Sequence, residues 1–335
     1  MTTFIFVVAF CIVAVLVYMA RYSGRLRVAQ TRIIDAPVAE VYARVVDLRN
    51  WRDWSPWLEH EADAPVTFSD KTDGAGSRCA WNSARIGTGR IEHVRVLPPG
   101  RIEQRMRFRH PFAFRGRSSW QFADCQGKTK VTWSLRGRVA FPMRAFAQTV
   151  QGMIALDFRY GMDRLAGLVE SADAARYSIA YLGVRDIVAR SYACTTYSAS
   201  LAGLAEAMRK GIVELRRQLA SHGVQPSGEP IAIYVQTNIK LRTTVCHIGI
   251  PVDAAGFDRL PVRTLPAHRA YVVRLRGSRA GLEVAWYQAM QRMRIENIQP
   301  DLRIAPFERY LDDPGTGREN DHMTELHVPV RALTE

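Results

Sequence analysis

The first hydrophobic feature of the chain is a continuous apolar run over residues 4–20, FIFVVAFCIVAVLVYMA. At about 1.5 Å per helical residue it would be roughly 25 Å long, close to the shortest helix that crosses a bilayer. No Lys or Arg precedes the run and no Ala-x-Ala site follows it, which favours a transmembrane anchor over the alternative of a signal peptide. Arg21, Arg25 and Arg27 come next, so the positive-inside rule predicts an external N-terminus and cytoplasmic domains at the inner membrane.

From residue 25 onward the pattern alternates instead. It predicts a strand over residues 26–34, a helix over 38–46 opened by Pro37, and three tryptophans within 51–57. Further strands are expected at 77–81, 89–97, 101–108, 114–124 and 129–139, followed by a long amphipathic helix over 143–172. This order predicts an α+β domain in which an antiparallel sheet curls around its last helix.

Strand alternation also separates the two faces of that sheet. Met106, Trp120 and Trp133 fall on the inner face, while arginines such as Arg105 and Arg117 fall on the outer face. Two interpretations of the inner aromatic residues stay open. They are either ordinary core or the lining of a cavity for a hydrophobic small molecule.

After a polar join at residues 172–176, the pattern predicts a weak internal duplication. Each half begins with a strand-like stretch (179–193 and 258–275), continues with a helix (200–222 and 279–294) and ends with two strands (230–236 and 245–250; 303–311 and 323–330). Thr195 or Ser198 is the candidate N-cap of the first helix, and Gly223 is placed to end it. Two βαββ units side by side predict a cleft where their sheets meet.

The strand at residues 303–311 carries the most informative pair of side chains. Alternation places Glu308 and Tyr310 on one face, and Phe307, Arg309 and Leu311 on the other. A carboxylate beside a phenol in an apolar strand suits a cationic or polarised ligand. The alternative is an edge strand with Glu308 in water. The candidate walls of the site are aromatic, and each alone is more typical of core than of a ligand contact: Tyr192, Tyr234, Trp286, Tyr287 and Tyr310.

Composition narrows the partners. The 335-residue chain has a formal net charge of +14, which calls for an acidic partner. The basic strand face interleaves no aromatics, so a nucleic acid is not expected, and the anionic cytoplasmic leaflet is the nearest acidic surface. The five cysteines show no paired spacing and are expected to be free thiols, and neither a metal nor a cofactor is predicted.

Several motifs of residues 25–173 carry a family resemblance: IDAPVAEVY at 34–42, the tryptophans of 51–57, GAGS at 74–77, GTG at 87–89, Thr132-Trp133 and GLVE at 167–170. With these, the region resembles the SRPBCC superfamily, the helix-grip fold of START-like and polyketide-cyclase-like proteins. The resemblance implies an apolar cavity between the sheet and the long helix. It specifies fold far better than function.

A second set of motifs lies in residues 177–335: GEPIAIY at 228–234, HIGIPV at 247–252, LPAHR at 265–269, FERY at 307–310 and TELHVPV at 324–330. This region is similar to the GyrI-like effector-binding domain. The resemblance implies that Glu308 lies at the floor of a ligand cleft. Some members of that family hydrolyse electrophilic compounds with this glutamate.

Together these features predict a membrane anchor (residues 1–24) followed by two cytoplasmic domains that bind or sense a hydrophobic or cationic small molecule, without a DNA-binding domain. One alternative is a hydrolase or cyclase acting on hydrophobic electrophiles with Glu308 as acid or base. Another is a scaffold whose binding sites have degenerated.

Overall fold

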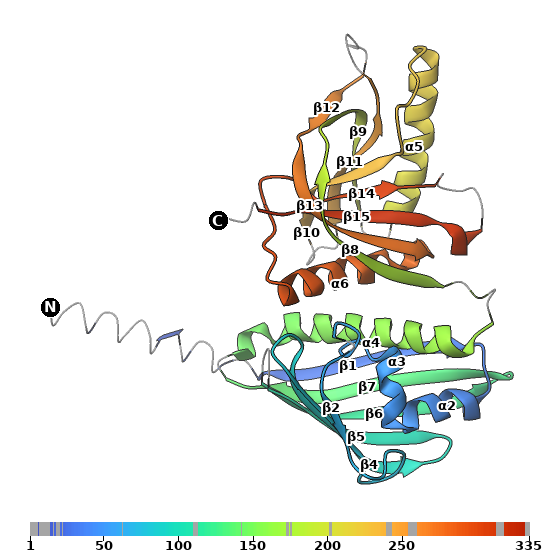
Figure 1. Ribbon diagram of the computed structural model, residues 1–335, viewed down its shortest axis with the longest axis vertical. Coiled ribbons are helices and arrows are strands. Elements are labelled where there is room, and N and C mark those ends of the chain that lie inside the picture. Colours follow the sequence, from blue (N-terminus) through green and yellow to red (C-terminus); the bar gives the residue numbers. More distant parts are fainter. Residues whose placement is uncertain are drawn as a thin grey trace. The chain divides into compact units, whose positions relative to one another are not determined.

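The computed structural model describes residues 6, 14–15, 17, 21, 23–61, 63–109, 113–141, 143–171, 174, 176–200, 203–238, 243–253, 260–312 and 318–331. The chain divides into two compact units, unit 1 (Met1–Ala174) and unit 2 (Ala175–Glu335) (Figure 1). Most of the anchor predicted at residues 4–20 lies outside these described residues. Within them, no helix is long and apolar enough to cross a membrane.

Unit 1 contains a seven-stranded antiparallel sheet with the strand order β1-β7-β6-β5-β4-β3-β2. Its strands are β1 (Arg25–Ile34), β2 (Val66–Phe68), β3 (Arg78–Ser83), β4 (Gly87–Leu97), β5 (Arg101–Phe108), β6 (Phe114–Cys125) and β7 (Lys128–Val139). Six were predicted from alternation. The three-residue β2 was missed, because so short a strand shows no period.

The α-helices that the described residues form beside this sheet are α2 (Val38–Val46), α3 (Trp51–Trp54) and α4 (Ala147–Val169). Pro37 is the N-cap of α2, in the extended conformation that its ring favours. Two short 3-10 turns, η1 (Leu48–Asn50) and η2 (Met143–Phe146), precede α3 and α4. Helix α4 packs closely at Gly161, where an added Cβ would lie 2.9 Å from Pro56 and 3.3 Å from Trp133. A small residue at this point lets the helix approach the tryptophan core.

Unit 2 contains an eight-stranded sheet with the order β12-β9-β11-β10-β14-β15-β13-β8. Its strands are β8 (Tyr177–Ile187), β9 (Arg190–Ser200), β10 (Ile231–Asn238), β11 (Thr243–Pro251), β12 (Val262–Leu265), β13 (His268–Gly277), β14 (Phe307–Tyr310) and β15 (Met323–Pro329). The helices are α5 (Leu204–Ser221) and α6 (Leu282–Ile295), with 3-10 turns η3 (Arg279–Gly281) and η4 (Glu319–Asp321).

The duplication is present, but the repeated unit differs from the predicted βαββ. Each long strand-like stretch is divided in two, β8 and β9 in the first half, β12 and β13 in the second. The leading strands are exchanged between the halves, since β8 pairs with β13 and β12 pairs with β9. The halves join where β10 pairs with β14.

The start of the first helix was predicted wrongly. Strand β9 continues to Ser200 in its pairing with β11, so Thr195 and Ser198 lie in the strand and cap nothing. The N-cap of α5 is Gly203. The predicted end of this helix is confirmed, because Gly223 adopts the left-handed φ of +69° just after α5.

Both helices of unit 2 cover the same face of the sheet. Cys246 and Ile248 of β11 pack with Met208 and Ile212 of α5. Leu326 of β15 belongs to the cluster that contains the α6 residues Ala285 and Ala289. The helix-covered face therefore extends across the junction between the halves.

Candidate functional site

Strand pairing puts Glu308 at the centre of unit 2. It lies directly opposite Ala232 on β10 and Leu326 on β15. Residues opposite each other in an antiparallel pair share a face, and Ala232 and Leu326 both belong to clusters packed against the helices. Glu308 therefore points into the helix-covered layer, where its side chain is only 1% exposed.

Three aromatic donors surround the Glu308 carboxylate. Trp286 of α6 donates its indole N–H to Oε1 at 2.7 Å, and Tyr310 donates its hydroxyl to Oε2 at 2.5 Å. The hydroxyl of Tyr234 on β10 also acts on this carboxylate and lowers its pKa. We refer to Glu308, Tyr310, Tyr234 and Trp286 as the Glu308 site. Sequence analysis proposed all four residues, and the fold brings them together from three different elements.

Burial and hydrogen bonding act on Glu308 in opposite directions. Burial raises the pKa of the carboxyl, while the bonds from Tyr310, Trp286 and Tyr234 and the charge of Arg279 lower it, and the raising effect is larger. Burial, together with the neighbouring Glu308, raises the pKa of Tyr234 and Tyr310 well above that of free tyrosine. Both phenols therefore remain protonated and act as donors.

Arg279 is the cation that acts on Glu308 among the described residues, and it forms an ion pair with Asp312. Its Nη2 lies 2.9 Å from Asp312 Oδ2, and its guanidinium lies 5.2 Å from the centre of the Tyr310 ring. Asp312 pairs with Arg279 and, through the same Oδ2, also contacts His322. Glu308, Arg279 and Asp312 together carry a net charge of −1 whenever Glu308 is ionised.

Aromatic surface separates this charge from solvent. Tyr234 and Trp286 are half-buried, and their rings meet edge to face with centroids 5.7 Å apart. Cys246, opposite Tyr234 on β11, is fully buried, and burial raises the pKa of its thiol to about 11. The thiol is therefore neutral, which leaves Glu308 as the ionisable determinant of the site.

Tyr192 is not part of this arrangement, contrary to the sequence-based expectation. Its neighbour Ala193 packs on the α5 side, so Tyr192 points to the opposite face of the sheet, where it packs with Phe307 and Leu265. Leu311 was expected to share the face of Phe307 but follows the last residue of β14. Arg279 and Cys246 were missed, because only strand pairing and helix placement bring them near Glu308.

In unit 1 the predicted cavity residues lie in a packed aromatic core. Met106, Trp120 and Trp133 are fully buried. The ring of Trp133 stacks on that of Trp120, with the ring centroids 4.2 Å apart, and on that of Phe158 of α4, with the centroids 3.6 Å apart. Trp51 and Trp54 meet the same rings edge to face. A ligand between the sheet and α4 would have to displace these side chains.

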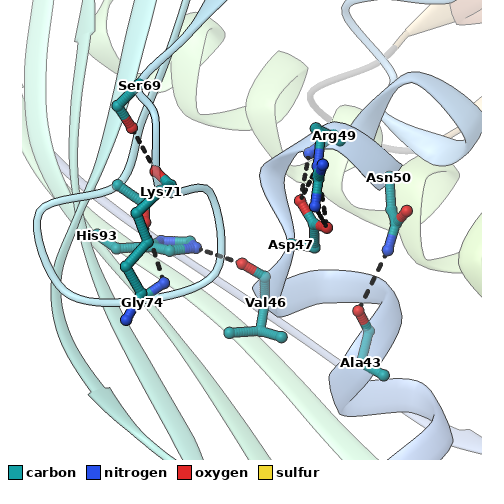
Figure 2. Close-up of polar contacts among 10 residues, drawn as sticks. Ala43, Val46, Asp47, Arg49, Asn50, Ser69, Lys71, Gly74 and His93 are labelled. Atoms are coloured by element: carbon teal, nitrogen blue, oxygen red, sulfur yellow. Dashed lines mark hydrogen bonds and ion pairs between the residues drawn. The ribbon is translucent and has the colours of Figure 1, made fainter.

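A hydrogen-bonded chain fixes one edge of this core. His93 lies 2.8 Å through Nε2 from the Val46 carbonyl at the end of α2, a contact that Figure 2 shows beside the Asp47–Arg49 ion pair. Its Nδ1 lies 3.2 Å from Gln104 Nε2, and Gln104 Oε1 accepts from Trp120 at 3.1 Å. One neutral tautomer, protonated on Nε2, satisfies every partner. Burial lowers the pKa of His93, which also favours the neutral ring. This histidine is therefore a structural group.

Comparison with known proteins relates unit 1 to a family. Residues 25–170 match the family model described as polyketide cyclase / dehydrase and lipid transport. This match agrees with the helix-grip resemblance of the motifs quoted above. No curated protein matches the chain by sequence.

Solved structures resemble parts of the chain at low identity. Protein CV1439 from Chromobacterium violaceum is 16% identical, covers 43% of this chain and 97% of its own, and has a TM-score of 0.34. The C-terminal domain of EcmrR is 18% identical, with 47% and 99% coverage and a TM-score of 0.37. SAV2435, solved bound to tetraphenylphosphonium, is 13% identical, with 46% and 95% coverage and a TM-score of 0.35. Likeness at this level says nothing about the ligand or activity of this chain.

Proposed function

We propose that unit 2 binds hydrophobic organic cations, with Glu308 as the charge partner and the aromatic side chains of the Glu308 site as walls. The observation that carries this proposal is a buried carboxylate, Glu308, that forms no ion pair with any cation among the described residues. Arg279 is paired with Asp312, and the other groups around Glu308 are neutral donors. A ligand that brings its own positive charge supplies the missing partner.

The magnitude of the charge interaction favours a cation over a neutral ligand of the same shape. At about 4 Å and an effective dielectric constant of about 20, opposite unit charges attract by about 4 kcal/mol. A cation over the face of Trp286 or Tyr234 gains about 0.5–2 kcal/mol more. A neutral molecule gains neither contribution, although it buries the same apolar surface.

For the whole chain, we propose an inner-membrane protein anchored by residues 4–20, with the domains at 25–173 and 177–335 on the cytoplasmic side. The residues described within that run, among them Phe6, Val15 and Val17, are helical, apolar and exposed. Such a protein would sense or sequester hydrophobic cations at the membrane, where they accumulate, and would have no DNA-binding function of its own.

A second candidate function is hydrolysis of electrophilic compounds. Its support is the raised pKa of Glu308, which suits a general acid or base. Against it, both carboxylate oxygens already accept hydrogen bonds from aromatic donors. Catalysis would require a water molecule or substrate to displace one of those donors.

One experiment separates these functions. The chain from Arg21 to Glu335 is titrated with tetraphenylphosphonium, a permanent cation, and with neutral triphenylphosphine oxide, and is assayed in parallel for hydrolysis of aromatic esters and epoxides. The proposal expects binding of the cation, at least tenfold weaker binding of the neutral compound, and no turnover. Equal binding of both compounds contradicts it, and turnover that Glu308→Gln abolishes establishes the hydrolase instead.

A further inference from the structure

The outer face of the unit 1 sheet carries its arginines in two adjacent cross-strand rows. The first row runs Arg90, Arg107, Arg115, Arg138, Arg25 over strands β4, β5, β6, β7 and β1. The second runs Arg105, Arg117, Arg136, Arg27 over β5, β6, β7 and β1. All nine side chains are exposed. We call these nine residues the arginine rows.

Like charges directly opposite each other destabilise a sheet, so this arrangement is costly unless an anion neutralises it. Among the described residues, Glu92 is the acidic side chain that forms ion pairs with the arginine rows, at 3.7 Å from Arg90 and 3.6 Å from Arg105. The other seven arginines form no ion pair with any residue in the described ranges. The next row along the same strands pairs Arg95 with Glu103 and continues with Ser119 and Ser134. The row after it contains Leu97, Arg101, Gln121 and Thr132, so the excess charge lies at one end of the sheet.

Exposed apolar side chains lie at that same end. Strand β7 ends at Val139, which donates its backbone N–H to the Gly24 carbonyl just before β1. The segment that follows leads into α4 and exposes Phe141 (44%), Met143 (38%) and Phe146 (50%). Figure 1 shows β1 and this segment starting at the same end of unit 1.

The position of this end along the chain identifies a partner. Arg25 follows the apolar run of residues 4–20 by five residues, which span at most about 18 Å. We propose that the arginine rows together with Phe141, Met143 and Phe146 dock unit 1 onto an anionic phospholipid bilayer. The arginines contact headgroup phosphates, and the three apolar side chains enter the boundary between headgroups and acyl chains.

A membrane fits this surface better than a nucleic acid does. Single-stranded nucleic acids are held by aromatic side chains interleaved with the basic ones, and the arginine rows contain none. The phenylalanines instead lie to one side of the rows, as in a surface that is basic on one part and apolar on the next. The proposal relies on the anchor proposed above only for the expectation that a membrane lies close to residue 25.

The test uses the chain from Arg21 to Glu335, which lacks the anchor, so that the surface and the anchor can fail independently. Both cores remain, since the first core residue is Leu26. Flotation at about 0.1 M salt, where charges are screened over about 10 Å, should recover the protein with vesicles containing phosphatidylglycerol and not with pure phosphatidylcholine. Equal recovery with both lipids, or with neither, overturns the proposal.

Two matched variants locate the surface. Replacing Arg107, Arg115, Arg117 and Arg136 by Gln should lower the vesicle partition coefficient by several hundredfold, at about fivefold per arginine. The control replaces Arg209, Lys210, Arg216 and Arg217 of α5 by Gln, which removes the same charge from unit 2 and should change partitioning less than fivefold. An equal loss in both variants would mean that net charge alone attracts the chain, and the docking surface would be wrong.

Two further readouts keep the outcome clear. The arginine-row variant should unfold at the same or a higher temperature than the parent, because repulsion is relieved. The Phe141→Ser, Phe146→Ser variant should lose the binding that remains at high salt, by roughly tenfold for each phenylalanine. Unfolding of the first variant, unchanged salt-resistant binding in the second, or binding of single-stranded RNA as tight as that of vesicles would each contradict the proposal.

Discussion

Glu308→Gln is the substitution that isolates charge in the Glu308 site. Glutamine keeps the shape of the side chain and an oxygen that accepts from Trp286 or Tyr310, but removes the negative charge. At about 4–6 Å and an effective dielectric constant of about 20, the lost attraction to a cation is about 3–4 kcal/mol. The dissociation constant for tetraphenylphosphonium should therefore rise by about two to three orders of magnitude.

The pH dependence gives an independent check on the same residue. A cation requires ionised Glu308, so its affinity for the parent should fall as pH falls through the raised pKa of this carboxyl, while the affinity of the variant should stay flat. Stability changes in the opposite sense. Because the folded-state pKa is raised, the contribution of Glu308 to stability is fully present below the unfolded value of about 4.3 and is lost as pH rises through the folded pKa. Relative to the variant, the free protein should thus become less stable toward neutral pH.

Isothermal titration calorimetry and urea unfolding between about pH 4 and 8 measure both effects. The matched control is Glu283→Gln, which removes the same charge from the exposed side of α6 and should change neither. The reasoning is refuted if Glu308→Gln binds the cation as the parent does. It is equally refuted if Glu283→Gln loses as much affinity as Glu308→Gln.

Three further predictions concern other parts of the chain. Trp120→Ala should lower the free energy of unfolding of unit 1 by about 3–5 kcal/mol in urea, because the indole is fully buried and stacked on Trp133; a variant that stays stable but loses binding of an apolar fluorophore would instead reveal a ligand cavity. His93→Gln should remove a loss of stability that the parent shows below about pH 6.5, since burial lowers the pKa of His93 and protonation breaks its bond from Gln104; a parent–variant difference that does not depend on pH would contradict this. A reporter enzyme that is active only in the cytoplasm should be active when fused after Glu335, and a reporter that is active only outside the inner membrane should be inactive there. The opposite result would contradict the proposed orientation.

Sequence alternation predicted the features that are set within a single strand, namely which side chains share a face. It placed Glu308 and Tyr310 on one face and identified the outward arginines of β5, β6 and β7, because side chains alternate with a period of two whatever the strand pairs with. It predicted α2 at residues 38–46, where an apolar helical period follows Pro37. It also identified the inner aromatic stripe of unit 1.

Features that depend on pairing between distant segments were not predictable in this way. Tyr192 faces away from Glu308 because β9 pairs with β11 in a register that the sequence of β9 does not specify. The division of each long stretch into two strands follows from the exchange of β8 and β12 between the halves. The ion pair of Arg279 with Asp312, beside the Glu308 site, joins residues 33 positions apart.

A crystal structure of the chain with tetraphenylphosphonium would test the central claim most directly. The account predicts the phosphonium within about 6 Å of the Glu308 carboxylate, with phenyl groups against Trp286 and Tyr234. Density for the cation between the sheet and α4 of unit 1, among Trp120 and Trp133, with the Glu308 site unchanged, would contradict it.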